Sequence, residues 1–278
     1  MAGGDPSRAR CPAVSGRGRR EGEVVSHVHG DTAERARESG GRPRPRMENQ
    51  WHAYWDRLEE HIIFRVEAAD YVTRLEAALG LEPGARVLDF GCGFGFVGEL
   101  LAPRVAELYA FDASDQMQRR AQLRLASHAN VRFLGPPGTT PWPAGLRFDL
   151  ILVNSVAQYM PLDELQQWLG RWRAMLAPGG HVVLSDLLTH DVDPLREVVE
   201  LLVLSARRGC LMSVVRKALG ELRQYTKTRR VRPLSQIAFG DLRERAGRLG
   251  LAVDVLPSNL TYKKARATAV LSMSATDP

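Results

Sequence analysis

The sequence predicts an α/β protein built around a doubly wound, mainly parallel sheet. Short apolar runs alternate with segments of helical periodicity between residues 84 and 188, which is typical of parallel strands covered by helices on both faces. A glycine-rich turn, residues 91–95, directly follows the first apolar run. The 278 residues, 44% of them hydrophobic, are enough for one sizeable core with an insertion.

The first folded segment is expected to be helical, because apolar residues recur at helical spacing over residues 51–79 and Gly80 is a typical helix stop. Five buried strands are expected next, at residues 85–90, 106–112, 131–134, 148–155 and 181–188. The helices between them are expected over residues 94–101, 114–127 and 162–176. Ser114 is suited to cap the second of these helices.

After Leu188 the alternation ends and helical patterns dominate. Asp193 and Pro194 form a cap and first-turn pair, and helical periodicity continues to about Tyr225. We expect residues 189–235 to form a helical lid over a substrate, because insertions at the carboxyl ends of parallel strands usually shape a pocket. The remaining elements are a helix over 236–249 and two strands over 251–256 and 267–273. These strands should be antiparallel, since no crossover helix separates them, and they bring the sheet to about seven strands.

The amino-terminal 46 residues differ in composition from the rest of the chain. They contain 10 arginines and 6 acidic residues, are rich in glycine, proline and serine, and show almost no apolar periodicity. We therefore predict a disordered tail over residues 1–46, or a translation start at Met47. Residues 47–278, expected to form the folded domain, hold a nearly balanced 28 basic and 26 acidic side chains.

Several classes of protein are excluded by composition. The three cysteines, Cys11, Cys92 and Cys210, have no paired spacing, which argues against a disulfide scaffold, a zinc site or an iron–sulfur cluster. No acidic trio clearly indicates a divalent metal. No apolar run approaches the roughly 20 residues that span a bilayer, and the amino terminus has no apolar signal core. A cytoplasmic protein without a membrane span is expected.

The glycine-rich turn points to a nucleotide-like ligand. Residues 93–98 form a G-x-G-x-x-G string, which alone suggests a dinucleotide site. However, Asp89 lies two residues before Gly91, and a carboxylate in a partly dry pocket would repel a pyrophosphate. The same carboxylate suits a cationic ligand. Asp112, at the end of the second expected strand, can accept two ribose hydroxyls with either ligand.

Four segments in the expected order carry a family resemblance: "VLDFGCGFG", "FDAS", "FDLILVNSVAQYM" and "LAPGGHVVLSD". Together they resemble the successive motifs of class I S-adenosylmethionine-dependent methyltransferases, over about residues 84–188. The resemblance implies a Rossmann-like seven-stranded sheet with the order 3-2-1-4-5-7-6 and an antiparallel seventh strand. It also implies S-adenosyl-L-methionine as the cofactor, whose sulfonium and ammonium groups would explain Asp89.

The resemblance assigns nine residues to the cofactor: Asp89, Gly91, Gly93, Gly95, Asp112, Ala113, Met117, Asn154 and Ser155. Within this set, Asp112 would bind the ribose, Ala113 and Met117 would lie near the adenine, and Asn154 and Ser155 would line the methionine portion. Gln158 and Tyr159 would face the cofactor or the acceptor. Gly98 is expected in helix–strand packing instead. The chain departs from the family at residues 135–138, Gly-Pro-Pro-Gly, where an acidic residue often reads the adenine amino group.

Methyl transfer from a sulfonium needs a general base only if the acceptor must lose a proton. His190 and Tyr159 are the candidate catalytic residues, and Asp186 and Tyr262 are further polar residues near the expected pocket rim. Each also has an ordinary structural explanation, as a packing, capping or surface residue.

A small-molecule acceptor, methylated on O, N or C in secondary metabolism, is the leading hypothesis. The residues after the fourth strand, 154–157, lack the Asn/Asp-Pro-Pro-aromatic turn typical of enzymes that methylate base nitrogens. One alternative is an RNA or protein methyltransferase that uses a basic block over residues 207–232, with nine Lys or Arg residues and one acid. Only Tyr225 is aromatic in that block, so nucleic acid is not the expected partner. Another alternative is a noncatalytic module that binds the cofactor or a partner.

Overall fold

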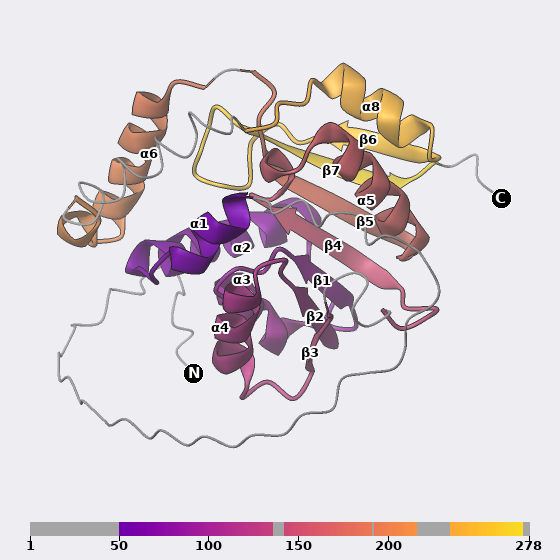
Figure 1. Cartoon of the computed structure of the whole chain (residues 1–278), viewed down its shortest axis with the longest axis horizontal. Helices are drawn as coiled ribbons and strands as arrows, with labels where there is room; N and C mark the ends of the chain where they lie inside the picture. Colours follow the sequence, from indigo (N-terminus) through magenta and orange to yellow (C-terminus); the bar gives the residue numbers. More distant parts are fainter. Residues whose placement is uncertain (1–49, 136–141, 191, 216–233, 275–278) are drawn as a thin grey trace, which may run out of the picture.

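A computed structural model describes residues 50–135, 142–190, 192–215 and 234–274 of the chain. The predicted tail over residues 1–46 lies outside the described residues, as does most of the basic block. The described part forms a seven-stranded sheet with helices on both faces (Figure 1).

The sheet has the order β3-β2-β1-β4-β5-β7-β6, which confirms the prediction. The strands are β1 Arg86–Phe90, β2 Glu107–Phe111, β3 Val131–Phe133, β4 Phe148–Asn154, β5 Leu176–Leu187, β6 Leu251–Val255 and β7 Ala267–Met273. The first five strands are parallel, and β7 runs antiparallel to both β5 and β6. The carboxyl ends of β1, β4 and β5 therefore lie side by side.

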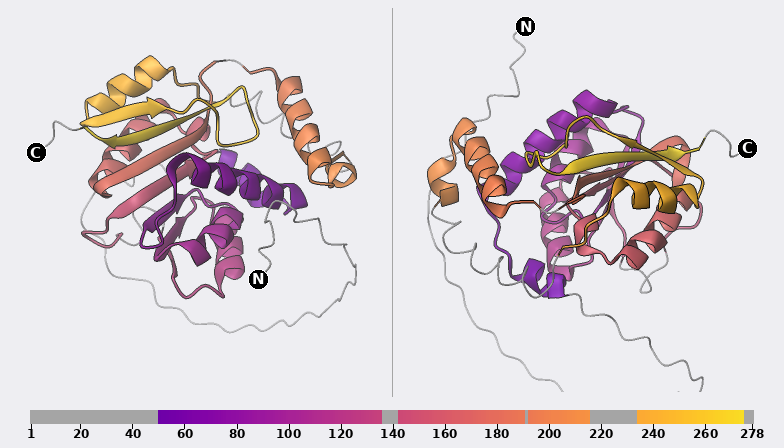
Figure 2. Two further views of the ribbon diagram at one scale, coloured as in Figure 1. Left: turned by 180° about the vertical axis from the view of Figure 1, so that it is seen from behind. Right: turned by 90° about the horizontal axis from the view of Figure 1, so that it is seen from above.

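Helices lie on both faces of the sheet, so that the sheet separates two layers of helices (Figure 2). The helices are α1 Gln50–Arg57, α2 Ile62–Leu79, α3 Phe96–Leu101, α4 Asp115–Leu125, α5 Leu162–Ala174, α6 Pro194–Arg207 and α8 Phe239–Gly247, with short 3-10 turns η2 Ala102–Arg104 and η3 Ala157–Tyr159. Side chains of α5 and α8 share one core with Leu88 and Phe90, whereas α2 and α3 share another with Val87. Successive residues of β1 thus enter opposite cores, as the alternation of a strand requires.

Local sequence signals fix several helix ends as predicted. Ser114 caps α4, because its side chain accepts a hydrogen bond from the Met117 backbone N–H. Asp193 caps α6 in the same way through the Leu195 N–H. Gly80 ends α2 with a positive φ of 71°.

Strand β5 begins earlier than predicted, at Leu176 rather than at His181. Leu176 pairs with Phe148, and the register then shifts before His181 pairs with Leu150. Residues 178–180, which suggested a turn before the strand, therefore lie within an irregular first part of it.

The predicted helical insertion is interrupted. Helix α6 ends at Arg207, Gly209 takes a positive φ of 72°, and a new helical segment is described over residues 211–215. Figure 2 shows α6 set apart from the sheet, beside the amino-terminal helices. The segment over residues 211–215 contacts the amino-terminal helices as well: Val214 packs with Ile63 of α2, and Ser213 lies 3.1 Å from His61 in a hydrogen bond. In the part of the chain that the structure describes, no helix has the length and apolar character to cross a membrane.

Candidate active site

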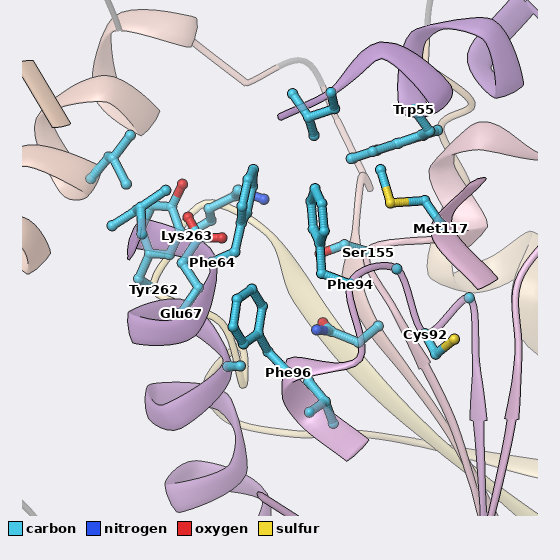
Figure 3. A pocket seen from close by; sticks show the side chains of 18 of the residues that line it. Trp55, Phe64, Glu67, Cys92, Phe94, Phe96, Met117, Ser155, Tyr262 and Lys263 are labelled. Atoms are coloured by element: carbon cyan, nitrogen blue, oxygen red, sulfur yellow. The ribbon is translucent and has the colours of Figure 1, made fainter. Parts of the chain in front are cut away.

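A cavity of about 660 Å³ opens at the carboxyl ends of the central strands (Figure 3). Its lining comes from segments far apart in sequence: the amino-terminal helices, the loop after β1 with the start of α3, Met117 of α4, the end of β4 with the turn after it, α6 with Val214, and the loop between β6 and β7. Figure 3 shows Cys92 and Met117 on one side of the cavity and Glu67, Tyr262 and Lys263 on the other. We call these two sides the cofactor end and the acceptor end.

The glycine turn forms the wall of the cofactor end. Gly91 and Gly93 have positive φ angles of 80° and 52°, a conformation that glycine adopts without the cost of a side chain. A Cβ on Gly91 would lie 2.3 Å from Val156 Cγ2, so this position is closed by packing. A Cβ on Gly93 would meet no atom within 4 Å, so the backbone there faces open space that a ligand can occupy.

Two other glycines of the motif serve packing. Gly95 is the N-cap of α3, and a Cβ there would lie 3.1 Å from Ala121. A Cβ on Gly98 would lie 3.1 Å from both Leu108 and Leu125, in agreement with its expected place in helix–strand packing. The structure does not bring Gly95 to the cavity lining, although the resemblance assigned it to the cofactor.

Asp89 supplies an unsatisfied carboxylate to the cofactor end. The side chain is buried, and its Oδ2 has no hydrogen-bond partner among the described residues. Burial, assisted by the nearby charge of Asp112, raises the pKa of Asp89 to about 7. Asn154, at the end of the adjacent strand β4, has a buried Oδ1 that likewise lacks a partner. Two free acceptor atoms on one wall suit a ligand that is positively charged or donates hydrogen bonds.

Asp112 stabilises the glycine turn through hydrogen bonds to its backbone. Its carboxylate accepts hydrogen bonds from the backbone N–H groups of Gly93, at 2.8 Å, and Ser114, at 2.9 Å. Asp112 and its exposed neighbour Ala113 are not among the residues that line the cavity. The structure thus brings six of the nine predicted cofactor residues to the lining: Asp89, Gly91, Gly93, Met117, Asn154 and Ser155. Residues 136–138 of the departure from the family motif lie outside the described residues.

The two predicted catalytic residues have different positions. Tyr159 lines the cavity and packs edge to face against Trp55, with ring centroids 5.5 Å apart. His190 is exposed and is not among the lining residues; its Nδ1 lies 2.9 Å from the Thr189 hydroxyl. Gln158, also expected to face the cavity, is buried outside the lining, and its Oε1 has no partner among the described residues.

The polar residues of the acceptor end were mostly missed by sequence reasoning, which named only Tyr262. They are Glu67 of α2, Glu197 of α6, and Tyr262, Lys263 and Arg266 of the loop between β6 and β7. An apolar wall completes this end, formed by Ile63, Phe64, Val198, Leu201, Leu202 and Val214. A signal was present only for the loop, where three polar or basic residues follow one another at 261–263 before the last strand.

A buried carboxylate, Asp186, connects the two ends. Its Oδ2 lies 2.7 Å from Lys263 Nζ and 2.9 Å from Arg266 Nη1, and it accepts a 2.9 Å hydrogen bond from the Ser155 hydroxyl. Thr261 donates a further hydrogen bond of 2.7 Å to Oδ1. Although burial opposes ionisation, the two cations hold the pKa of Asp186 well below its usual range. Among the described residues, no cluster of His, Cys, Asp or Glu could hold a metal ion.

Comparisons with known proteins agree with this architecture. A protein-L-isoaspartate O-methyltransferase of Anaeromyxobacter dehalogenans is 35% identical over 116 residues, which cover 41% of this chain and 52% of that protein. A trans-aconitate 2-methyltransferase of Rhodopseudomonas palustris is 31% identical over 145 residues, 51% of this chain and 53% of that protein. The chain therefore spans about half the length of these relatives.

The fold is also found in a solved structure of CalS10 with bound SAM, described as an amino pentose methyltransferase from Micromonospora echinaspora involved in calicheamicin biosynthesis. The TM-score is 0.51 at 16% identity, and the match covers 84% of this chain and 100% of that one. This level of likeness concerns the fold alone. A model of the methyltransferase domain family matches residues 58–228, more than half of the sequence. The chain belongs to the methyltransferase domain family.

Proposed function

We propose that this protein transfers the methyl group of S-adenosylmethionine to a small molecule bound in the same cavity. The observation that carries the proposal is the unpartnered, buried oxygen of Asp89 beside the open space at Gly93. S-adenosylmethionine carries an α-ammonium and a sulfonium, and Asp89 would hold the cationic amino-acid end directly or through water. Asn154 and Ser155 would contact the same portion of the cofactor.

Asp112 remains our candidate for the ribose. Its carboxylate directly follows β2 and accepts hydrogen bonds from the backbone N–H groups of Gly93 and Ser114 at the glycine turn. A carboxylate at this place in the fold can accept hydrogen bonds from ribose hydroxyls. Met117, which is buried and lines the cavity, would lie against the adenine.

When bound, the cofactor supplies a methyl group on a sulfonium, so that an acceptor can attack the methyl carbon in line and S-adenosylhomocysteine is the leaving group. The protein would contribute by holding the two reactants in line and by keeping water out. The aromatic side chains Phe64, Phe94 and Trp55 line the cavity and suit the second task. Tyr159 would orient the acceptor by its hydroxyl.

The form of the cavity favours a small acceptor over a macromolecule. Its volume lies in the range of about 300–1,000 Å³ that is usual for small-molecule sites. Helices α2 and α6 wall the acceptor end, so a protein or RNA chain would need to extrude a single residue into it. The relatives include enzymes named for protein and for small-molecule acceptors, so they do not select between the two. A role in secondary metabolism stays a prediction.

Calorimetric titration with S-adenosylhomocysteine tests the proposal. Replacement of Asp89 by Asn removes a charge-assisted contact worth roughly 1.5–3 kcal/mol and should weaken binding about ten- to hundredfold. Asp163→Asn, an equivalent change at an exposed position on α5, should bind like the unaltered protein. Equal affinity of the Asp89 variant, or tight binding of a nicotinamide dinucleotide, would contradict the proposal.

A further inference from the structure

Glu67 faces the acceptor end from the second turn of α2. Figure 3 shows it beside Tyr262 and Lys263 of the loop between β6 and β7, across the cavity from Met117. The charges that act on the Glu67 carboxylate are those of Lys263, Asp186 and Asp70, and the Tyr262 hydroxyl donates a hydrogen bond to it. Glu67 therefore has one neutral hydrogen-bond donor, one nearby cation and two nearby carboxylates.

The two cations at this end, Lys263 and Arg266, already form ion pairs with carboxylates other than Glu67. Lys263 Nζ lies 2.7 Å from Asp186, and Arg266 binds both Asp186, at 2.9 Å, and Glu197, at 2.6 Å. Two positive charges thus serve two carboxylates, and Glu67 is a third. Within the described residues, no cation forms an ion pair with Glu67. When Glu67 is ionised, the acceptor end consequently has one surplus negative charge, on a side chain that lines the cavity.

We propose that the acceptor is an amine on an apolar body, and that Glu67 binds its ammonium group and then takes up its proton. This inference rests on the proposed function and specifies its acceptor. The apolar wall of Ile63, Phe64, Leu201 and Val214 would cover the body of the acceptor. A carboxylate acceptor would have to share Lys263 and Arg266 with Asp186 and Glu197, and ionised Glu67 would repel it.

The proton balance of the reaction requires such a group. An ammonium nitrogen has no free electron pair, so one N–H proton must first move to the Glu67 carboxylate. The nitrogen pair then forms the N–CH₃ bond while the S–CH₃ bond breaks and its electron pair stays on sulfur. The products are S-adenosylhomocysteine, a methylated ammonium and a protonated Glu67, which returns its proton to water.

The surroundings of Glu67 suit this exchange. Burial has the largest effect and raises the pKa of Glu67 to about 7. The charge of Lys263 and the hydrogen bond from Tyr262 lower this pKa in part, and the charges of Asp186 and Asp70 raise it further. A base whose pKa lies near the working pH is partly ionised and can both accept and release a proton.

Three probes of similar shape test the inference: phenethylamine, phenethyl alcohol and phenylacetate. Each is titrated into the protein saturated with S-adenosylhomocysteine. The amine should bind about ten- to hundredfold more tightly than the alcohol, because it forms a charge-assisted contact. Glu67→Gln should abolish this preference while leaving binding of S-adenosylhomocysteine unchanged. Glu76→Gln, the same change on the same helix but at its salt bridge with Arg104, should keep the preference.

A pH series, with Tyr262→Phe as a second variant, tests whether the preference for the amine depends on the protonation of Glu67 and not only on packing. The preference for the amine should increase from about pH 6 to about pH 8 as Glu67 ionises. Tyr262→Phe removes a hydrogen bond that favours the ionised carboxylate, so it should move this transition to higher pH.

The remaining outcomes would overturn the inference. Equal binding of amine and alcohol, tighter binding of phenylacetate, or no binding of any probe would each show that this end does not select an amine. In all three cases, intact binding of S-adenosylhomocysteine leaves the proposed function standing. Failure of S-adenosylhomocysteine itself to bind would instead remove the proposed function, and the inference with it.

Discussion

Asp89 and Asp186 are both buried carboxylates, but their surroundings shift their pKa values in opposite directions. Asp186 has two cations and several hydrogen-bond donors, so it stays ionised although it is fully buried. Asp89 has an oxygen without a partner and a neighbouring carboxylate, Asp112, so its ionised form is disfavoured. The contacts of Asp186 are complete within the protein, whereas a cationic ligand would complete those of Asp89.

This difference predicts a pH dependence for cofactor binding. In the free protein the pKa of Asp89 is raised to about 7, and the α-ammonium group of the ligand would lower it on binding. Binding below that pH then releases a proton, so affinity for S-adenosylhomocysteine should increase from about pH 5.5 to about pH 7 and level off above. Calorimetry in buffers of different ionisation heats would measure both the affinity and the proton release.

Asp89→Asn is the control for this pH dependence, because the variant cannot ionise at that position. Its weaker binding should vary little over the same range. A wild-type protein with constant affinity, or a variant that keeps the full pH dependence, would show that another group is responsible.

At the scale of elements, Asp186 holds the ends of two strands and a loop together. It lies near the end of β5, bonds Ser155 just after β4, and contacts Thr261, Lys263 and Arg266 in the loop between β6 and β7. Asp186 and Ser155 are the two non-glycine residues with positive φ in the described part of the chain, at 70° and 58°. Such strained backbone persists only where the surrounding contacts hold it in place.

Asp186→Asn should therefore destabilise the protein strongly. Asn accepts a positive φ, so the change removes the charge without adding backbone strain. Loss of one partner from a buried ion pair costs about 3–5 kcal/mol, which urea unfolding would measure. Because the folded-state pKa of Asp186 is lowered, its contribution should be complete above the unfolded value of about 4 and lost as the pH falls further.

Asp254→Asn, at an exposed position on β6, should change the free energy of unfolding by no more than about 0.5 kcal/mol. If Asp186→Asn were equally mild, the contacts of Asp186 would not be holding the loop in place.

Some elements could be predicted from sequence because their signals act over a few residues. Ser114 and Gly80 are examples, since a cap or a stop depends on its own side chain and the adjacent turn. The start of β5 could not be predicted in this way. Leu176 joins the sheet because it pairs with Phe148, whereas the local sequence at residues 178–180 favours a turn.

The two ends of the cavity also differ in whether local sequence or contacts between distant segments determine them. Most of the cofactor end follows one strand and one turn, so Asp89 and Gly93 could be recognised from their spacing. The acceptor end combines Glu67, Glu197 and Lys263 from three distant segments. In the sequence Glu67 is one of several acidic residues on a helix, and only the fold shows that it faces the cavity.

At the scale of the whole molecule, the distribution of charge distinguishes a small-molecule acceptor from an RNA acceptor bound by the basic block. Residues 47–278 have nearly equal numbers of basic and acidic side chains, and the basic block over residues 207–232 has one aromatic residue, Tyr225. Most of that block lies outside the described residues. A nucleic-acid groove usually combines positive charge with aromatic stacking, and the sequence provides little of the second.

We therefore expect RNA binding to be weak, insensitive to sequence and lost near physiological salt. Each phosphate that the protein neutralises on a single strand should steepen the fall of log affinity with log salt by about 0.7, so a few non-specific contacts give a shallow slope. Fluorescence anisotropy with labelled RNA over a salt series measures the slope, and labelled methyl transfer to total RNA tests the activity. Replacement of Arg229 and Arg230 by Glu should leave S-adenosylhomocysteine binding unchanged. A steep slope together with saturable methylation of one RNA, abolished by that double replacement, would make RNA the acceptor and the block its binding site.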